Sequence, residues 1–465
     1  MVSIAPGASF LRITSCLHAA CRVADIPTSI TIIELQDVRL QIKRYSTFDG
    51  DRGEAAIKRD AMKRFGSEGY RKMTDTAGLV IYGDDSRNKL HLKVVTAENG
   101  DRSIYNVILA GGGNDILDGR AFTSAEAAVL GTYGVQFFGE DGNDKLIDSV
   151  GTDTLNGGAG NDHITWTSGV DTIDGGDGTD TLIIAASTRL SSKSLSISGI
   201  ERLQIDGTTQ ITDLDLEQFD VITGDQRAGP THIEFHRQVT IEHVEFIGNP
   251  WDLLGSDDND TFDLLASRRK FHLNAGGGDD VIIGGQKVNE LSGGDGDDHV
   301  TGGPVNDWLS GGGGNDTVIG GDGNDYFLET SGGSKAFGGN GRDEFQFSDC
   351  TGEISGEEGG DTIVLKNGMF TVDGGEDSDQ INIDFRQIGQ FAIASGGDGN
   401  DHFLYKGHGS DAAVTLHGGA GTDVLQLAGR DLSHLVADGV ERLSLTGTDL
   451  LIGADTLGSF AGVDS

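Results

Sequence analysis

The sequence predicts an all-β fold, a parallel β-roll or β-helix solenoid of nonapeptide repeats with a small α+β segment at its N-terminus. Residues 275–382 divide into twelve consecutive blocks of nine with no residue inserted or deleted. Seven of these blocks begin with a glycine pair, and eight carry Asp at the sixth place. A strict period of this length indicates stacked coils. The eighth place is apolar in every block: Ile282, Leu291, Val300, Leu309, Val318, Phe327, Ala336, Phe345, Ile354, Ile363, Val372 and Ile381.

Each block combines a turn with a short strand. A chain that reverses every nine residues needs positive φ angles and close backbone approach, which glycine allows. The last three residues, as in Thr317, Val318 and Ile319, suit a short strand whose middle side chain points inward. A glycine turn that ends in Asp offers carbonyl and carboxylate oxygens, the ligands of which calcium takes six to eight. The period therefore predicts calcium sites at the turns and an apolar core behind them.

The blocks at Gly293–Thr301 and Gly311–Leu328 resemble the RTX, or haemolysin-type, calcium-binding repeats, whose consensus is G-G-x-G-x-D-x-apolar-x. The resemblance implies a right-handed parallel β-roll in which two nonapeptides form one coil, so that alternate turns lie on opposite edges. It also implies that each calcium ion lies between neighbouring turns of one edge and that the sixth-place Asp bridges successive ions. Members of the family usually leave the cell through a type I secretion apparatus, guided by an uncleaved C-terminal signal.

Counting in steps of eighteen assigns the sixth places of residues 275–382 to two edges of such a roll. The first edge holds Asn289, Asp307, Asp325, Asp343, Asp361 and Asp379. The second edge holds Asp280, Asp298 and Asp316, followed by Ser334, Gly352 and Phe370, which offer no carboxylate. We expect calcium along the whole first edge and none on the second edge beyond Asp316. The predicted turn glycines of these sites are Gly293, Gly311, Gly320 and Gly338.

Two calcium-binding rolls are predicted, at residues 110–183 and 255–426. In the first, AGGGNDILD provides Asp115, and after an insertion the phase restarts at Gly139 with Asp144, Asp153, Asp162, Asp171 and Asp180 at the sixth places. Asp148 and Trp166 replace glycine on the edge of Asp153 and Asp171, so the opposite edge should bind calcium better. In the second roll, further predicted ligands are Asp260, before the regular blocks, and Asp401 and Asp423, each after a slip in phase.

A second repetition follows each roll. The residues Gly199 to Leu203 read GIERL, and Gly439 to Leu443 read GVERL, each at a similar distance after a GGxGTD block. Because the last units of a stacked array must cover its open core, we interpret these segments as calcium-free closing strands. Residues 184–254 are then a cap or spacer, and residues 427–465 a C-terminal cap and possible secretion signal. A ligand-binding role for the Glu–Arg pair is the alternative.

Residues 1–109 are predicted to be an N-terminal segment that leads into the first roll. Its first 75 residues carry a charge near +3, against near −43 for the remainder. Alternation around Val38 predicts a strand, and Glu54–Phe65 a basic helix. A head domain or partner-binding arm competes with a simple capping segment, a tail or an upstream extension. Strands are expected at Leu79–Tyr82, Leu90–Val95 and Tyr105–Leu109.

Composition and motifs exclude several functions. A net charge of −40 disfavours nucleic acid and attracts cations. No run of eighteen apolar residues predicts a membrane span, and the three cysteines are too scattered for a disulfide framework. No HExxH, GxSxG or GxxxxGK[ST] motif occurs, so we predict that the protein is not an enzyme. His232, Glu234 and His236 alternate as a zinc-binding strand would, or as a solvated face.

The function expected from the sequence is that of a secreted, extracellular calcium-binding protein with a structural or surface-interaction role. It should fold when it binds several calcium ions outside the cell, because stacked aspartates repel one another without a cation and binding energy becomes folding energy. Its partners would be calcium ions, the type I secretion apparatus and a cell-surface or polysaccharide partner. The alternative is an exported enzyme or effector, polysaccharide-active or toxin-like, that uses the rolls as a secretion and folding module.

Overall fold

The computed structural model describes most of the chain from Val80 onward. The predicted helix at Glu54–Phe65 lies outside the described residues, as does most of the C-terminal tail. Near Val38 only a two-residue strand is described, β4 (Val38–Arg39), which pairs with β3 (Glu34–Leu35). The described residues are 2–3, 12–13, 34–35, 38–39, 80–83, 85–91, 93–96, 102–105, 107–120, 128, 134–184, 188–190, 194–205, 209–211, 215–224, 231–248, 250–407, 412–428, 431–432, 434–446, 451–452 and 462–464.

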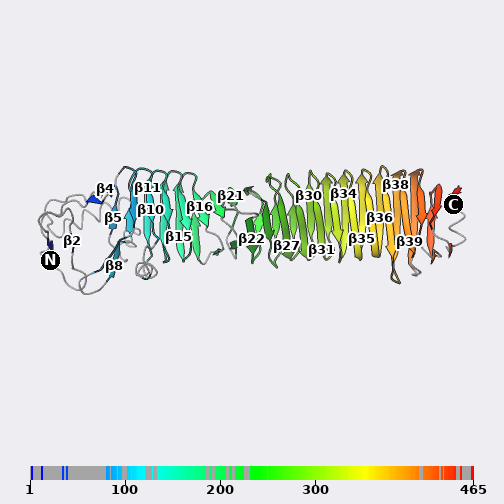
Figure 1. Ribbon diagram of the computed structural model, residues 1–465, viewed down its shortest axis with the longest axis horizontal. Helices are drawn as coiled ribbons and strands as arrows, with labels where there is room; N and C mark the ends of the chain where they lie inside the picture. The colour runs from blue at the N-terminus through cyan, green and yellow to red at the C-terminus, as the bar shows by residue number, and fades with distance from the viewer. Residues whose placement is uncertain are drawn as a thin grey trace. The chain divides into compact units, whose positions relative to one another are not determined.

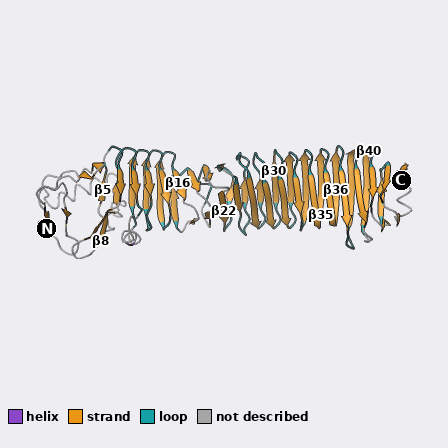
Figure 2. Ribbon diagram, viewed as in Figure 1, coloured by secondary structure: helices purple, strands orange, loops and turns teal. Residues whose placement is uncertain are grey.

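Every element whose bounds are described is a β-strand (Figures 1 and 2), and Ala128 is a single helical residue within the described ranges. The chain forms two compact units, Met1–Asp206 and Gly207–Ser465. The boundary between the units falls inside the segment predicted to be a cap or spacer. In the repeat region of each unit, strands alternate between two parallel ladders, so the predicted β-solenoid is confirmed.

In the first unit the two ladders each contain six strands. One ladder consists of β5 (Val80–Tyr82), β9 (Val107–Leu109), β11 (Gln136–Asp141), β13 (Thr154–Ala159), β15 (Asp171–Asp177) and β18 (Leu195–Ser198). The other consists of β6 (Lys89–His91), β10 (Ile116–Asp118), β12 (Lys145–Ile147), β14 (His163–Trp166), β16 (Thr181–Ile184) and β19 (Arg202–Ile205).

Two of the strands predicted ahead of the first roll are each divided in the structure. The segment expected at Leu90–Val95 contains β6 and a separate strand, β7 (Lys93–Thr96). The segment expected at Tyr105–Leu109 contains the end of β8 (Arg102–Tyr105) and all of β9. β7 and β8 pair antiparallel with each other, whereas β6 and β9 join the parallel ladders. The single-strand prediction was wrong because alternation of apolar residues does not reveal the change of partner.

In the second unit one ladder begins with β20 (Thr209–Ile211). It continues through β22 (Thr231–Phe235), β25 (Trp251–Leu254), β27 (Phe271–Gly277), β29 (Glu290–Asp295), β31 (Trp308–Gly313) and β33 (Tyr326–Glu329). The facing ladder begins with β23 (Thr240–Ile241), β26 (Thr261–Asp263), β28 (Val281–Ile283), β30 (His299–Gly303), β32 (Thr317–Asp322) and β34 (Gly333–Asn340). Both continue through β35 (Glu344–Glu358), β36 (Thr362–Glu376), β37 (Gln380–Phe385), β38 (Phe391–Gly399), β39 (His402–Gly407), β40 (Ala413–Gly421), β41 (Val424–Leu427), β43 (Leu435–Asp438) and β44 (Arg442–Leu445).

The pairing register confirms that two nonapeptides form one coil. Leu291 pairs with Leu309, eighteen residues on, and Ile381 pairs with Phe403, twenty-two residues on. The four extra residues of the longer coil fall between β37 and β38, outside the ladders. A slip in the sequence period therefore leaves the stacking of the coils intact.

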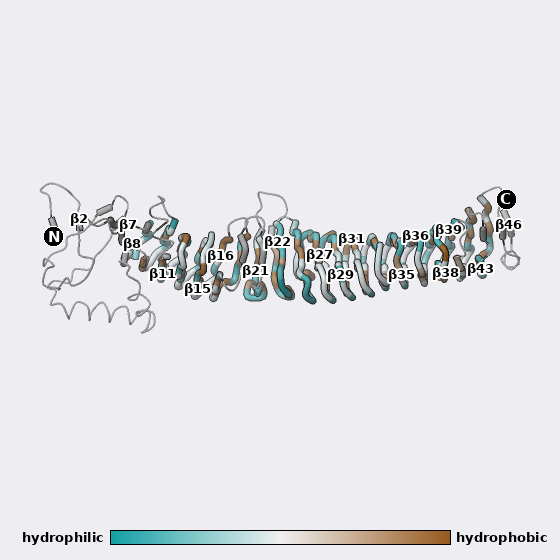
Figure 3. Tube along the Cα trace, turned by 90° about the horizontal axis from the view of Figure 1, so that it is seen from below, coloured by the Kyte–Doolittle hydropathy of each residue, from teal (hydrophilic) through white to brown (hydrophobic). Residues whose placement is uncertain are grey.

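The core of each roll is the row of eighth-place side chains. All twelve such residues between 275 and 382 are buried, with at most 3% of their surface exposed. Figure 3 shows polar and apolar residues alternating along the coils. Burying one Val, Leu or Ile side chain contributes about 1.5–3 kcal/mol, so the row supplies the apolar part of the stability of the roll.

Aromatic packing replaces the tight turn where the second edge lacks Asp. β35 and β36 each run for fifteen residues through this edge, which carries Gly352 and Phe370 at the sixth places. The ring of Phe370 is buried and lies 6.3 Å from that of Phe347 and 6.2 Å from that of Phe385. An apolar edge of this kind needs no cation to neutralise it.

Candidate calcium sites

The sixth-place aspartates form columns that run along the edges of the rolls. In the first unit the backbone N–H of Asp144 donates to Oδ1 of Asp162 at 2.7 Å, and that of Asp162 donates to Oδ1 of Asp180 at 2.7 Å. Asp115 joins the same column, because its N–H donates to Oδ1 of Asp144 at 2.6 Å. Because the coils stack in register, the N–H of each aspartate lies beside the carboxylate of the aspartate in the next coil. The insertion after Asp115 does not interrupt the column.

The column on the first edge of the second unit is the longest. It begins with Asn289, whose N–H donates to Oδ1 of Asp307 at 2.6 Å, and it continues with the same bond at every coil. The two phase slips do not break the column. The N–H of Asp379 donates to Oδ1 of Asp401, and the N–H of Asp401 donates to Oδ1 of Asp423, both at 2.9 Å. Its members are Asn289, Asp307, Asp325, Asp343, Asp361, Asp379, Asp401 and Asp423.

The opposite edges carry shorter columns. In the first unit the backbone N–H of Asp153 donates to Oδ1 of Asp171 at 2.6 Å. In the second unit the column runs through Asp260, Asp280, Asp298 and Asp316, with N–H to Oδ1 distances of 2.7 to 3.0 Å. The next sixth place is Ser334, whose hydroxyl lies 3.3 Å from Oδ2 of Asp316. Every predicted Asp ligand therefore lies in one of four columns.

The second carboxylate oxygen distinguishes two kinds of aspartate. For one kind, Oδ2 is buried and receives no hydrogen bond from any described residue. An unsatisfied buried carboxylate oxygen is costly unless a cation binds it. This group consists of Asp144, Asp162, Asp180, Asp280, Asp298, Asp307, Asp325, Asp343, Asp361, Asp379, Asp401 and Asp423.

In eleven of these twelve turns the first residue is a glycine that makes room for this oxygen, and the turn of Asp280 begins with Ala275. A Cβ on Gly320 would overlap both Oδ2 of Asp325 and the carbonyl oxygen of Gly338. A Cβ on Gly338 would overlap the equivalent oxygens one coil further on. The predicted turn glycines Gly293 and Gly311 likewise leave space for the carboxylates of Asp298 and Asp316. The turns that begin with Gly320 and Gly338 thus gather carboxylate and carbonyl oxygens around one point, which is the donor set of a hard cation such as calcium.

For the other kind of aspartate, the protein itself supplies donors to Oδ2. The N–H of Ser256 donates to Oδ2 of Asp260 at 2.7 Å, and the N–H of Ser149 donates to Oδ2 of Asp153 at 2.7 Å. The indole Nε1 of Trp166 donates to Oδ2 of Asp171 at 2.6 Å. These three turns carry Ser149 or Ser256 at the second place or Trp166 at the first, whereas the open turns have only Gly, Ala or Glu at these places. That difference gives the physical reason to expect weaker calcium binding on the edge of Asp153 and Asp171.

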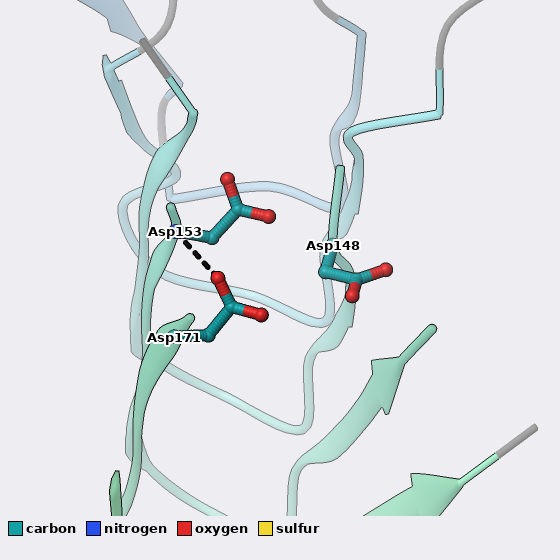
Figure 4. Close-up of side chains that lie close together, drawn as sticks. All are labelled: Asp148, Asp153 and Asp171. Carbon is teal, nitrogen blue, oxygen red and sulfur yellow. Dashed lines mark hydrogen bonds between the residues drawn. The ribbon is translucent and has the colours of Figure 1, made fainter. Parts of the chain in front are cut away.

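Asp148, Asp153 and Asp171 form a buried carboxylate group (Figure 4). One oxygen of each lies within 4.8 Å of the others, the one such group of three among the described residues. Asp148 accepts hydrogen bonds from the N–H and hydroxyl of Thr167, at 2.7 and 2.8 Å. Burial raises the pKa of Asp148 to about 6 and that of Asp171 to about 7. This group is held by protein donors, in contrast to the open turns.

Burial also raises the pKa of the column carboxyls that have a free Oδ2. The pKa of Asp325 is raised to about 8, and those of Asp144, Asp361 and Asp379 to about 7. In each, loss of solvent is the largest cause, the N–H of the preceding column member opposes it, and neighbouring carboxylates raise the pKa further. The ionised columns therefore destabilise a roll that holds no cation.

This shift predicts a pH dependence of the metal-free protein. Because the folded-state pKa values lie above that of an ordinary aspartate, the protonated columns favour folding at low pH, and this contribution is lost as the pH rises through about 6 to 8. We expect the melting temperature of protein dialysed free of calcium to be higher at pH 5.5 than at pH 8. With calcium present the order should reverse, since protons compete for the ligands. A metal-free melting temperature that rises with pH would contradict this.

Several residues around the columns could not be assigned from the repeat consensus. Glu201 and Glu441 each accept the N–H of the last column aspartate. Glu329 is buried and accepts the N–H of Gly311 and of Gly312, beside the turn of Asp316. The repeated sequences GIERL and GVERL could have indicated Glu201 and Glu441. Glu329 stands at the first place of its block, where the consensus has glycine, and nothing in the consensus indicates its role.

The His232, Glu234 and His236 stretch forms no compact metal group. His232 and Glu234 lie half-buried on one face of β22, and Nε2 of His236 is 3.5 Å from Oε1 of Glu234. The ligand atoms of these three residues do not converge as those of Asp148, Asp153 and Asp171 do. Nothing helical in the described part of the chain has the length and apolar character needed to cross a membrane.

Comparison with known families agrees with this geometry. The family model of the RTX calcium-binding nonapeptide repeat (4 copies) matches residues 105–123, 136–165, 167–183, 274–309, 301–328 and 407–428. No curated protein matches the chain. The first-edge column continues from Asp325 to Asp401 across residues 329–406, which the family model does not cover. The chain therefore carries RTX calcium-binding nonapeptide repeats in both of its units.

Proposed function

We propose that this is an exported protein whose two rolls fold outside the cell as their aspartate columns bind several calcium ions. Its role would then be structural or in surface interaction, with the rolls themselves as the functional body. The observation that carries this proposal is the free, buried Oδ2 in twelve of the turns. Eleven of them lie beside a first-place glycine that leaves space for the carboxylate, whereas the turn of Asp280 begins with Ala275. Ten of these eleven glycines also leave space for a backbone carbonyl oxygen.

The energetics support a fold that depends on calcium. Extracellular calcium modules bind with dissociation constants of about 10⁻⁴ to 10⁻³ M. A site held at ~10 times its dissociation constant contributes about 1.4 kcal/mol. Several such sites supply on the order of 10 kcal/mol, which equals the stability of an ordinary domain. In a compartment poor in calcium the same chain would stay loose enough to pass through a secretion channel.

Export is tested by expressing the full chain in a host that has a type I secretion apparatus. We expect the protein in the culture medium with its N-terminus intact, and we expect deletion of residues 427–465 to retain it in the cell. The mass of the N-terminal peptide and immunoblots of both fractions are the measurements. Retention of the full chain in the cell, or removal of an N-terminal leader, would refute this export route.

An exported enzyme or effector is the second candidate. A hollow of about 430 Å³ lies on the outer face of the second unit, where Trp308 is 56% exposed and its ring centroid is 4.7 Å from that of Tyr326. Exposed aromatic rings of this kind suit a polysaccharide partner. Deleting residues 1–110 or 184–254 in the same export experiment separates the candidates, because an activity located in the deleted segment would be lost while export and most of the calcium binding persist.

A further inference from the structure

The two GΦER segments, Gly199–Arg202 and Gly439–Arg442, where Φ is Ile or Val, end the longer aspartate column of each unit in the same way. In the first unit the N–H of Asp180 donates to Oε2 of Glu201 at 2.8 Å. In the second the N–H of Asp423 donates to Oε2 of Glu441 at 2.8 Å. Each glutamate thus occupies the position at which the next column member would present its carboxylate. Both segments lie beyond the residues that match the repeat family.

The strand register shows how a glutamate reaches that position. Asp174 pairs with Ser198, twenty-four residues on, whereas Thr181 pairs with Arg202, twenty-one residues on. The turn between these two points is therefore three residues shorter than the turn in the preceding coil. A shorter turn holds the backbone further from the column, and the additional methylene of Glu relative to Asp spans the difference.

The same shortening occurs in the second unit. His417 pairs with Asp438, twenty-one residues on, whereas Val424 pairs with Arg442, eighteen residues on. Two segments about 240 residues apart in the chain therefore show one turn type. Both shortened turns contain a glycine with positive φ, 59° at Gly199 and 64° at Gly439, a conformation that favours glycine.

The glycine of each shortened turn supplies a second oxygen. A Cβ on Gly175 would overlap the carbonyl oxygen of Gly199, and a Cβ on Gly418 that of Gly439. In a regular turn the carbonyl oxygen of the next first-place glycine occupies this space, as Gly418 does above Gly396. The terminal turns thus preserve the carbonyl and the carboxylate of an ordinary site.

The columns on the opposite edges end differently. There the last aspartate receives a donor, since the Ser334 hydroxyl faces Oδ2 of Asp316 and the Trp166 indole faces Oδ2 of Asp171. The glutamate endings add only acceptors, and Oδ2 of Asp180 and of Asp423 stays buried with no hydrogen bond from a described residue. Carboxylate and carbonyl oxygens that converge on a buried, unsatisfied oxygen are stable only around a cation.

We propose that Glu201 and Glu441 are terminal calcium ligands, each completing one more site, with Asp180 or Asp423 and the carbonyl of Gly199 or Gly439. The GΦER segment is on this view the closing half of a metal site as well as the start of the closing strand. This inference rests on the proposed calcium binding of the columns. It assigns a role to segments that the sequence alone suggested were free of calcium.

The test is the number of calcium ions bound per full-length chain, measured by equilibrium dialysis and metal analysis at about 1 mM calcium. Glu→Gln at 201 or 441 keeps an oxygen that can accept the N–H of the last aspartate but removes the charge. We expect each single variant to lose about one bound ion and the double variant about two. The control, Glu245→Gln, makes the same change on an exposed strand residue and should lose none.

The outcomes separate this inference from the proposal on which it rests. If Glu201→Gln and Glu441→Gln bind as many ions as the wild type while Asp343→Asn binds fewer, the terminal sites are refuted and the columns stand. If the wild-type chain binds no calcium, both fail. For a variant that folds poorly, calcium is raised about tenfold: recovery of the strand signal supports a lesion at a ligand, and failure to recover indicates a packing role and overturns the inference.

Discussion

Excess chelator is expected to remove most of the β-strand circular dichroism signal of the full chain, and added calcium to restore it. In the columns successive aspartates are one strand spacing apart, about 4.8 Å. Two such charges repel by on the order of 3 kcal/mol at an effective dielectric constant near 20. The longest column contains seven consecutive aspartates, from Asp307 to Asp423, so repulsion recurs at every coil.

Magnesium is the matched control for the chelation experiment. It requires nearly octahedral geometry and retains several waters, whereas these turns present fixed carbonyl and carboxylate oxygens. Magnesium at the same concentration should therefore restore much less of the signal than calcium does. If the strand signal is equally strong in chelator and in calcium, the columns are not held by metal, and the proposed mechanism of folding is wrong.

Replacing one aspartate in the middle of the long column is expected to have the second largest effect. Asp343→Asn retains an acceptor for the N–H of Asp325, now 2.7 Å from Oδ1, but removes the charge at the free Oδ2. Since the family resemblance implies that such an Asp bridges successive ions, we expect a loss of about two bound calcium ions. The calcium concentration at half-maximal folding should rise by about tenfold, which a titration followed by circular dichroism measures.

Asp260→Asn is the matched control for Asp343→Asn. Both side chains are buried, and both accept a backbone N–H at 2.7 Å, from Val239 and from Asp325, but Oδ2 of Asp260 is already satisfied by Ser256. We expect Asp260→Asn to lose no calcium and to lower the free energy of unfolding by about 1–3 kcal/mol through its broken hydrogen bonds. Equal losses of calcium in the two variants would show that the state of Oδ2 does not select the metal sites.

Much of the fold could be predicted from the sequence because the period of nine is also the period of the structure. The eighth-place residues are the buried row, and steps of eighteen gave the strand partners and the two edges. Even the early end of the second-edge column follows from the residue types alone, since Gly352 and Phe370 cannot supply a carboxylate. These features depend only on residue type and spacing along one chain.

The nature of each turn could not be predicted in this way. Asp171 and Asp162 are both sixth-place aspartates, yet Oδ2 of Asp171 receives the Trp166 indole while Oδ2 of Asp162 receives nothing from the described residues. The aromatic edge at Phe370 was missed for a related reason. In each case the outcome depends on which side chain fills a space, and the repeat consensus does not encode this.

By itself, then, the sequence determined that the chain stacks into calcium-type coils and which residues face inward. Only the tertiary structure decided where a column stays open and how it ends. Glu201 lies outside any block of nine, and it enters the column because a turn three residues shorter brings its longer side chain beside Asp180. A count along the chain cannot detect a ligand whose position is set by the coil stacked against it.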